Sequence, residues 1–155
     1  MAAAEITYVN NASTTVSCSE RNGSREAPFC EIADALSNGR SVLLVMGSSN
    51  MYASFSVSQG SITVVGPGRD LSPSARIAGI SVTGSAHLLV RDLWLTPLSA
   101  MTAAQCDGAD LVLRKVNIQS ADPNQRGQRG VASKGCSQLV LEESMVDGMN
   151  GAGVV

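Results

Sequence analysis

The feature that most constrains the fold is a short segment that occurs three times in the chain. The copies begin at Leu88, Leu111 and Leu139, and the second interval is slightly longer than the first. In each copy the first and third residues are apolar, and the sixth and eighth are apolar again except at Ser144. A repeat of roughly this length predicts a solenoid, in which each copy packs on the next one.

The spacing of the apolar residues within each copy predicts a bend. Alternation of apolar and polar residues indicates a strand with one buried face. The step from the third to the sixth residue breaks this alternation, and charged residues occupy the step. A single straight strand would place the sixth and eighth residues on the face opposite to the first and third. Two short strands joined by a corner keep all of these residues inside.

Weaker copies extend the pattern towards the N-terminus. Ile62 precedes Leu88 by an interval similar to those between the clear copies, and a run of aliphatic residues at 42–45 lies a slightly shorter interval earlier again. A third strand in each turn fits four further positions: Ile80, Ala103 or its neighbours, Val131 and Val154. We therefore predict an all-β fold, a right-handed parallel β-helix of about four to five coils spaced about 4.8 Å apart.

Two other architectures share part of this pattern. A leucine-rich repeat requires an asparagine at a fixed position, and no such ladder occurs here. A β-sandwich spaces its strands evenly but does not repeat a corner. We predict a single β-helix domain over residues 1–155, with an N-terminal cap at 5–40 and coils at 41–155. Because the chain stops on an apparent strand at Val155, we expect it to be a piece of a longer protein.

One segment near the N-terminus has the spacing of a helix. Within residues 28–37, Phe29, Ile32 and Leu36 recur at helical intervals, and Asn38-Gly39 follows as a C-terminal stop signal. We predict a short helix that covers the open first coil, because exposed strand edges promote unwanted pairing.

The four cysteines are widely spaced and form no CxxC pair. An even number at such spacing favours two disulfides and an oxidising compartment over a zinc site. Cys18 with Cys30 would close a polar loop, and Cys106 with Cys136 would join two successive repeats. The sequence leaves this connectivity open, and four free buried thiols are the alternative.

The order of features over residues 6–47 is distinctive. An opening strand, Ile6-Thr7-Tyr8-Val9, precedes a cysteine loop, a Pro28-Phe29-Cys30-x-Ile-x-x-Ala stretch and a Val-rich strand that ends in Gly47. This order resembles the N-terminal part of bacterial surface proteins of the pectin-lyase-like right-handed β-helix superfamily. Glu31 stands where those proteins often have Thr. The superfamily includes polysaccharide lyases, hydrolases, esterases and adhesins, so the resemblance implies a fold without implying one function.

Outward-facing positions of the repeat are expected to stack into columns. The second position gives an apolar stripe, Leu89, Val112 and Val140, with Thr63 as its continuation, which either lies beneath a loop or contacts a partner. Trp94 also points outward, where it would stack on a sugar ring or pack beneath a loop. The charged columns at the fourth and fifth positions are expected to set register and solubility: Arg91, Arg114 and Glu142, then Asp92, Lys115 and Glu143. In the polar insertion at 121–129, Arg126 and Arg129 are candidate partner contacts.

We predict no catalytic, cofactor or metal site. The resemblance implies that an enzyme of this fold would use clustered aspartates, for which Asp107, Asp110 and Asp122 are the candidates. Asp-Gly before a strand is more typical of a turn, and calcium needs six or more oxygen ligands. His87 is the only histidine; no Ser or Cys is placed by a motif to pair with it, and we expect it in a turn.

Charge and composition limit the function further. The net charge is -2 and the pI about 5.3, without the basic footprint of a nucleic-acid-binding protein. No apolar run approaches the roughly 18 residues of a membrane span. We expect a secreted or cell-surface, non-catalytic scaffold that binds a carbohydrate or a protein, or that self-associates through the apolar stripe or the open C-terminal coil. The alternative is the N-terminal fragment of a polysaccharide lyase or hydrolase.

Overall fold

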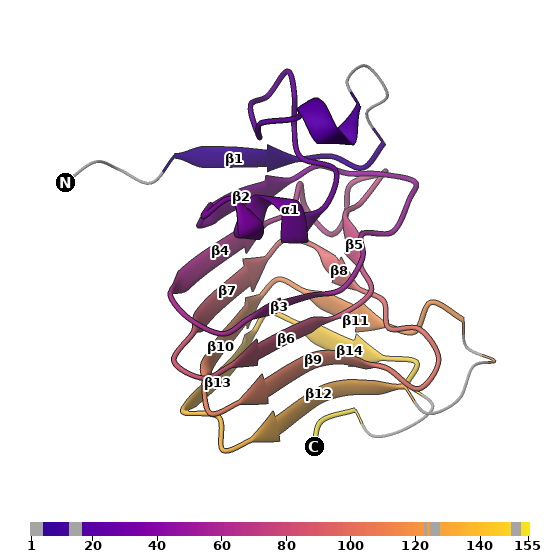
Figure 1. Cartoon of the computed structure of the whole chain (residues 1–155). Coiled ribbons are helices and arrows are strands. Elements are labelled where there is room, and N and C mark those ends of the chain that lie inside the picture. The colour runs from indigo at the N-terminus through magenta and orange to yellow at the C-terminus, as the bar shows by residue number, and fades with distance from the viewer. Residues whose placement is uncertain (1–4, 13–16, 123, 125–127, 150–152) are drawn as a thin grey trace.

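The computed structural model describes residues 5–12, 17–122, 124, 128–149 and 153–155. Within these residues the chain winds through three parallel sheets in turn, so that each coil lies on the one before it (Figure 1). This arrangement is a parallel β-solenoid, as the repeat predicts. Its axis runs from the N-terminal strand to the C-terminal coil.

The three sheets share one feature: every pairing between named strands is parallel and joins one coil to the next. In order of stacking, sheet A consists of β1 (Ile6–Val9), β2 (Val42–Val45), β4 (Ser61–Val65), β7 (His87–Arg91), β10 (Asp110–Arg114) and β13 (Gln138–Glu142). Sheet B consists of β5 (Arg76–Ile77), β8 (Trp94–Leu95), β11 (Asn117–Gln119) and β14 (Met145–Asp147). Sheet C consists of β3 (Phe55–Val57), β6 (Ile80–Thr83), β9 (Thr102–Asp107) and β12 (Arg129–Lys134).

The coils are most complete in the middle of the stack. In the part of the chain that is described, three coils have a named strand in every sheet, from β4 to β12. The coil before them uses a single bridge from Tyr52 to Ile77 in place of a sheet B strand, and the last coil uses a bridge from Val154 to Val131. The predicted count of four to five coils therefore includes incomplete coils at both ends.

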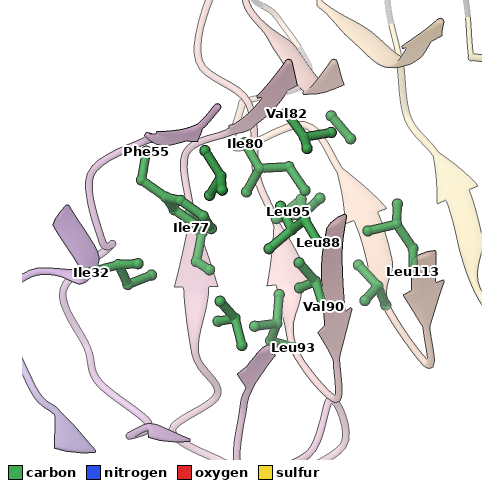
Figure 2. Close-up of a cluster of buried hydrophobic side chains, with 14 of the residues drawn as sticks. Ile32, Phe55, Ile77, Ile80, Val82, Leu88, Val90, Leu93, Leu95 and Leu113 are labelled. Atoms are coloured by element: carbon green, nitrogen blue, oxygen red, sulfur yellow. The ribbon is translucent and has the colours of Figure 1, made fainter. Parts of the chain in front are cut away.

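The predicted register of sheet A is confirmed. Leu111 pairs with Leu88 on one side and with Leu139 on the other, and Ile62 pairs with Leu88. Leu88 and Leu111 are buried inside the coil, whereas Leu139 is partly exposed in the last coil. The interior is filled by aliphatic side chains that point inward from all three sheets (Figure 2).

The predicted corner between sheets A and B has a definite backbone form. The fifth residue of each repeat has a positive φ, which is 60° at Asp92, 52° at Lys115 and 49° at Glu143. A residue with a positive φ interrupts the strand and turns the chain, so the residue after it points inward. These inward residues are Leu93 and Val116, and both are buried. A residue with a Cβ adopts this left-handed conformation at a cost of roughly 1–2 kcal/mol.

The N-terminal end of the stack is covered, as predicted. The helix α1 (Ile32–Ser37) contacts β1, β2 and β3, and its Ile32 and Ala35 are buried. It is shorter than the predicted 28–37 segment because Phe29 forms a parallel bridge with Val9 instead. A short 3-10 turn, η1 (Cys18–Glu20), lies in the preceding loop.

The free edge of β1 is closed by backbone hydrogen bonds from that loop. Tyr8 N–H donates to the Gly23 carbonyl at 2.8 Å, and Phe29 N–H donates to the Tyr8 carbonyl at 2.9 Å. Gly23 is required here, because a Cβ at this position would lie 2.6 Å from the Thr7 methyl group. The cap therefore removes an edge that would otherwise pair with other strands.

Both predicted disulfides are present in the structure. Cys18 is bonded to Cys30 within the cap loop, and Cys106 is bonded to Cys136 between β9 and the segment that follows β12. The first fixes the loop that closes β1. The second links two successive coils.

Candidate functional site on the outer face of sheet A

The outer face of sheet A carries an apolar file, interrupted at Thr63, across all of its described strands. Because the strands pair in register, the predicted stripe continues in both directions from Leu89 and Val112. The complete file is Ile6, Val42, Thr63, Leu89, Val112 and Val140. Ile6 is 55% exposed, and the residues after it are half-buried between their neighbours in the sheet. The structure thus aligns the three predicted stripe residues, continues them through Thr63 as the repeat suggests, and adds Ile6 and Val42.

A second outward file changes in character along the solenoid axis. It begins with apolar residues near the cap and ends with charged ones: Tyr8, Leu44, Val65, Arg91, Arg114 and Glu142. The face of sheet A is therefore broadly apolar at the capped end. Towards the C-terminal coil, only the first file is still apolar, and the charged residues of the second file run beside it.

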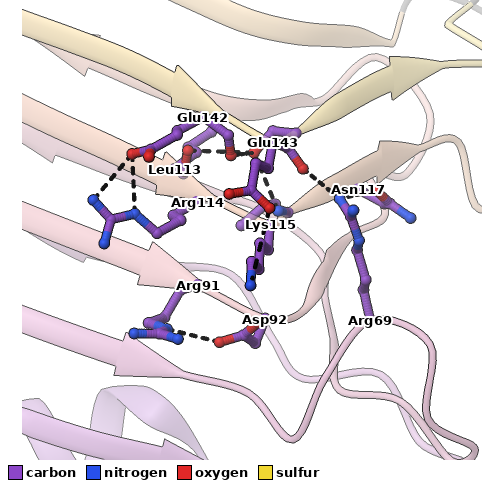
Figure 3. Close-up of polar contacts among 11 residues, drawn as sticks. Arg69, Arg91, Asp92, Leu113, Arg114, Lys115, Asn117, Glu142 and Glu143 are labelled. Carbon is purple, nitrogen blue, oxygen red and sulfur yellow. Dashed lines mark hydrogen bonds and ion pairs between the residues drawn. The ribbon is translucent and has the colours of Figure 1, made fainter.

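The charged residues at the corner between sheets A and B form short ion pairs (Figure 3). Arg114 lies 3.0 Å from Glu142, and Lys115 lies 3.9 Å from Glu143. Asp92 pairs with Arg91 at 2.7 Å rather than with Lys115 in the next coil. These pairs are partly exposed, so each contributes no more than about 1 kcal/mol to the free energy of unfolding. Their main effect is to favour the correct register.

Trp94 lies beneath a loop rather than free on the surface. Its indole Nε1 donates to the Arg69 carbonyl at 2.7 Å. The Arg69 guanidinium in turn donates to Asn117 Oδ1 at 3.2 Å and to the Glu143 carbonyl (Figure 3). This network holds the segment that follows Gly66 against sheet B. The indole N–H is therefore already used within the protein.

A polar file runs beside the apolar one, on the side where the chain enters sheet A. Ser61 pairs with His87, His87 with Asp110, and Asp110 with Gln138. His87 Nδ1 lies 2.6 Å from Asp110 Oδ2. The imidazole side chain is 61% exposed and the carboxylate 24% exposed. His87 is the first residue of β7, so the prediction that it lies in a turn was wrong.

The polar and apolar files line one open cavity. Its volume is about 180 Å³, and its lining includes Ser61, His87 and Asp110 from the polar file with Leu89 and Val112 from the apolar file. A larger cavity of about 520 Å³ adjoins it and shares Ser61 and Ile62 as lining residues. Together the two cavities form a groove that crosses the strands at the start of sheet A.

Arg40 borders the larger cavity on the side of Ser61 that faces away from His87. It precedes Val42 by two residues, as Ser61 precedes Thr63, and Val42 pairs with Thr63. One guanidinium nitrogen, Nη1, donates to Glu5 Oε2 at 2.9 Å. The Nε atom is buried and, among the described residues, has no hydrogen-bond partner. An N–H donor is therefore left unused beside Ser61.

The remaining candidates from the sequence do not gather at this groove. Asp107 and Asp110 flank a two-residue turn between β9 and β10, and only Asp110 lines the 180 Å³ cavity. Arg129 is the exposed first residue of β12, and Arg126 falls outside the described residues. Across the ranges that the structure describes, no group of three or more His, Cys, Asp or Glu residues is placed so that it could hold a metal ion.

Two groups at the capped end have a perturbed pKa. Burial raises the pKa of Tyr52 to about 12, and its hydroxyl donates to the Met46 carbonyl at 2.7 Å. Burial also raises the pKa of Glu31, opposed by a hydrogen bond from Ala53 N–H. Both groups belong to the cap and the first coil, away from the His87–Asp110 pair.

Comparison with known proteins gave no match to a family model, a curated protein or a solved structure. Among the described residues, no helix combines the length and the apolar character needed to cross a bilayer. The polar file was missed by reasoning from the sequence. The signal was available, because Ser61, His87 and Asp110 each stand immediately before an aligned Ile or Leu of the repeat.

Proposed function

We propose that this chain is a secreted or cell-surface binding scaffold that presents the outer face of sheet A to a partner. The observation that carries the proposal is the file of five apolar residues and Thr63 across six described strands of that sheet. Contiguous apolar surface on a soluble domain usually marks an interaction site. A rigid solenoid holds such a file at fixed spacing, which favours recognition without rearrangement of the scaffold.

Several features support an extracellular setting. Two disulfides link residues of the cap and of the coils, and such bonds persist in oxidising compartments. The resemblance of residues 6–47 to bacterial surface proteins of the pectin-lyase-like superfamily points the same way. We include membership of that superfamily in the proposal, together with a protein or a polysaccharide as the partner.

The proposal is tested by site-specific photo-crosslinking in cells that produce the protein. A photoreactive phenylalanine analogue replaces Val112 in the middle of the apolar file, or Ser81 on the outer face of sheet C as a control. Both positions are half-buried in a central strand of their sheet, so the two variants are matched in structure. We expect a discrete crosslinked product from position 112 and none from position 81. Equal products from both positions, or none from 112, would show that sheet A is not the binding face.

A further inference from the structure

We infer that Ser61, His87 and Asp110 form a serine-hydrolase site on the outer face of sheet A, acting on carboxylic esters with short apolar acyl groups. The inference goes beyond a binding scaffold, because it adds a covalent step on the same face. It also differs from the paired-carboxylate chemistry that the superfamily resemblance implies. It rests on three consecutive coils that place a Ser, a His and an Asp side by side.

The His87–Asp110 pair has the geometry of an oriented base. With Nδ1 at 2.6 Å from the Asp110 carboxylate, that nitrogen carries the proton and donates it. In the unprotonated form of the base, Nε2 is then the ring nitrogen that accepts a proton. A carboxylate that fixes the tautomer and stabilises the imidazolium is the role of the acid in a Ser-His-Asp triad. Asp110 is a positioning residue in this sense.

Ser61 stands on the other side of His87 from Asp110. Paired residues of adjacent parallel strands lie about 4.8 Å apart, so Ser61 and His87 are neighbours in the file. The inference requires the Ser61 hydroxyl to reach His87 Nε2 by rotation of the serine side chain alone, with the His87–Asp110 contact kept. Both residues line the 180 Å³ cavity. Ser61 is exposed at the start of β4 and is therefore open to a substrate.

The surroundings of Ser61 define the substrate class. Thr63, Leu89 and Val112 form an apolar wall two residues further along the strands, in the same 180 Å³ cavity. A cavity of this size suits a short apolar acyl group. The adjoining 520 Å³ cavity carries the hydroxyls of Ser41 and Ser58 and suits the alcohol part of the ester.

Arg40 supplies the positive charge that the reaction needs. Attack on an ester carbonyl places a negative charge on its oxygen, and donors aimed at that oxygen stabilise the transition state. Arg40 lines the same cavity as Ser61, and its side chain is 34% exposed, so the accessible part of the guanidinium can approach an oxyanion that forms at Ser61.

The reaction is balanced with water as the second reactant. The Ser61 oxygen forms a bond to the carbonyl carbon while His87 Nε2 takes the hydroxyl proton. The bond to the alcohol oxygen then breaks, and the alcohol leaves with the proton from His87. Water, deprotonated by the same nitrogen, attacks the acyl-serine, and the acid is released as Ser61 regains its proton.

The first test is covalent labelling of the whole chain with a fluorophosphonate probe, followed by peptide mass spectrometry. We expect the label on Ser61, and we expect its rate to fall about 10²- to 10⁴-fold in His87→Asn, the range for loss of a general base. Ser133→Ala is the matched control, because Ser133 is an exposed serine on a strand of sheet C and lines neither of the two cavities. That variant retains labelling at the wild-type rate.

The second test measures hydrolysis of p-nitrophenyl butyrate by wild type, Ser61→Ala, Arg40→Gln and Ser133→Ala. We expect Ser61→Ala to be inactive and Arg40→Gln to lose at least tenfold in kcat, with Ser133→Ala unchanged. Thermal unfolding of each variant checks that the fold is retained. An unlabelled Ser61, or equal hydrolysis by wild type and Ser61→Ala, overturns the inference. The crosslinking experiment needs no reactive serine and the labelling needs no partner, so each proposal can fail without the other.

Discussion

Replacement of Leu111 by alanine tests the central claim that the repeat builds one inner file. Leu111 is fully buried between Leu88 and Leu139 in the coils on either side. The substitution removes three carbons, a loss of about 2.4 kcal/mol at about 0.8 kcal/mol per buried CH₂. The cavity that remains adds to this loss, because paired strands on both sides prevent the neighbours from closing it. We expect the free energy of unfolding to fall by about 3–4 kcal/mol.

Leu139→Ala is the internal control for this prediction. Leu139 has the same side chain and belongs to the same file, but it is partly exposed in the last coil. We expect a loss of only about 1–2 kcal/mol, because less apolar area leaves water there on folding. Urea unfolding of the whole chain, followed by circular dichroism with the disulfides intact, gives both values. Equal losses from the two substitutions would refute the reasoning, since burial by both neighbouring coils would then contribute nothing.

Three further predictions concern the corner, the disulfide and the cap. Lys115→Gly should stabilise the protein by about 0.5–1 kcal/mol, because Lys115 has a φ of 52°, a conformation that glycine adopts without the steric cost of a Cβ. Lys134→Gly, in the extended β12 strand, should instead destabilise the protein. The urea midpoints of the two variants should shift in opposite directions. Replacing both Cys106 and Cys136 by alanine should cost about 3–4 kcal/mol, from the chain entropy of a loop with a sequence separation of 30; a thermal midpoint equal to that of wild type would contradict this. The pKa of Tyr52 is raised from 10.0 to about 12 in the fold, so its contribution to stability is fully present below pH 10 and is lost as the pH rises to 12. Tyr52→Phe should therefore lose less stability than wild type between pH 10 and pH 12.

The register of sheet A could be predicted because a slip by one residue would turn every inner side chain outward. Leu88, Leu111 and Leu139 are therefore fixed relative to one another by their own pattern. The short strands of sheet B could not be bounded in the same way, because two or three residues are too few to show an alternation. The helix start at Ile32 depends on the pairing of Phe29 with Val9, a contact between distant segments that no local pattern reveals.

The candidate site could likewise be predicted only in part from the sequence. That Ser61, His87 and Asp110 lie in one file follows from the repeat alignment, extended by one residue before its first apolar position. The short contact between His87 and Asp110 depends on side-chain rotamers, which the alignment does not determine. The position of the Arg40 side chain depends in addition on its ion pair with Glu5, a contact between segments far apart in the sequence.

The unequal spacing of the repeats has a consequence for how such a protein can change. The interval from Leu111 to Leu139 is longer than the interval from Leu88 to Leu111, yet the strands of sheet A pair residue by residue across both. The extra residues are accommodated entirely in the connections, so the length of a connection and the height of a coil are independent. Insertions in the connections can therefore accumulate without displacing the groove. A single deletion inside β7 or β10 would instead turn the side chains on one side of the deletion to the opposite face of the sheet.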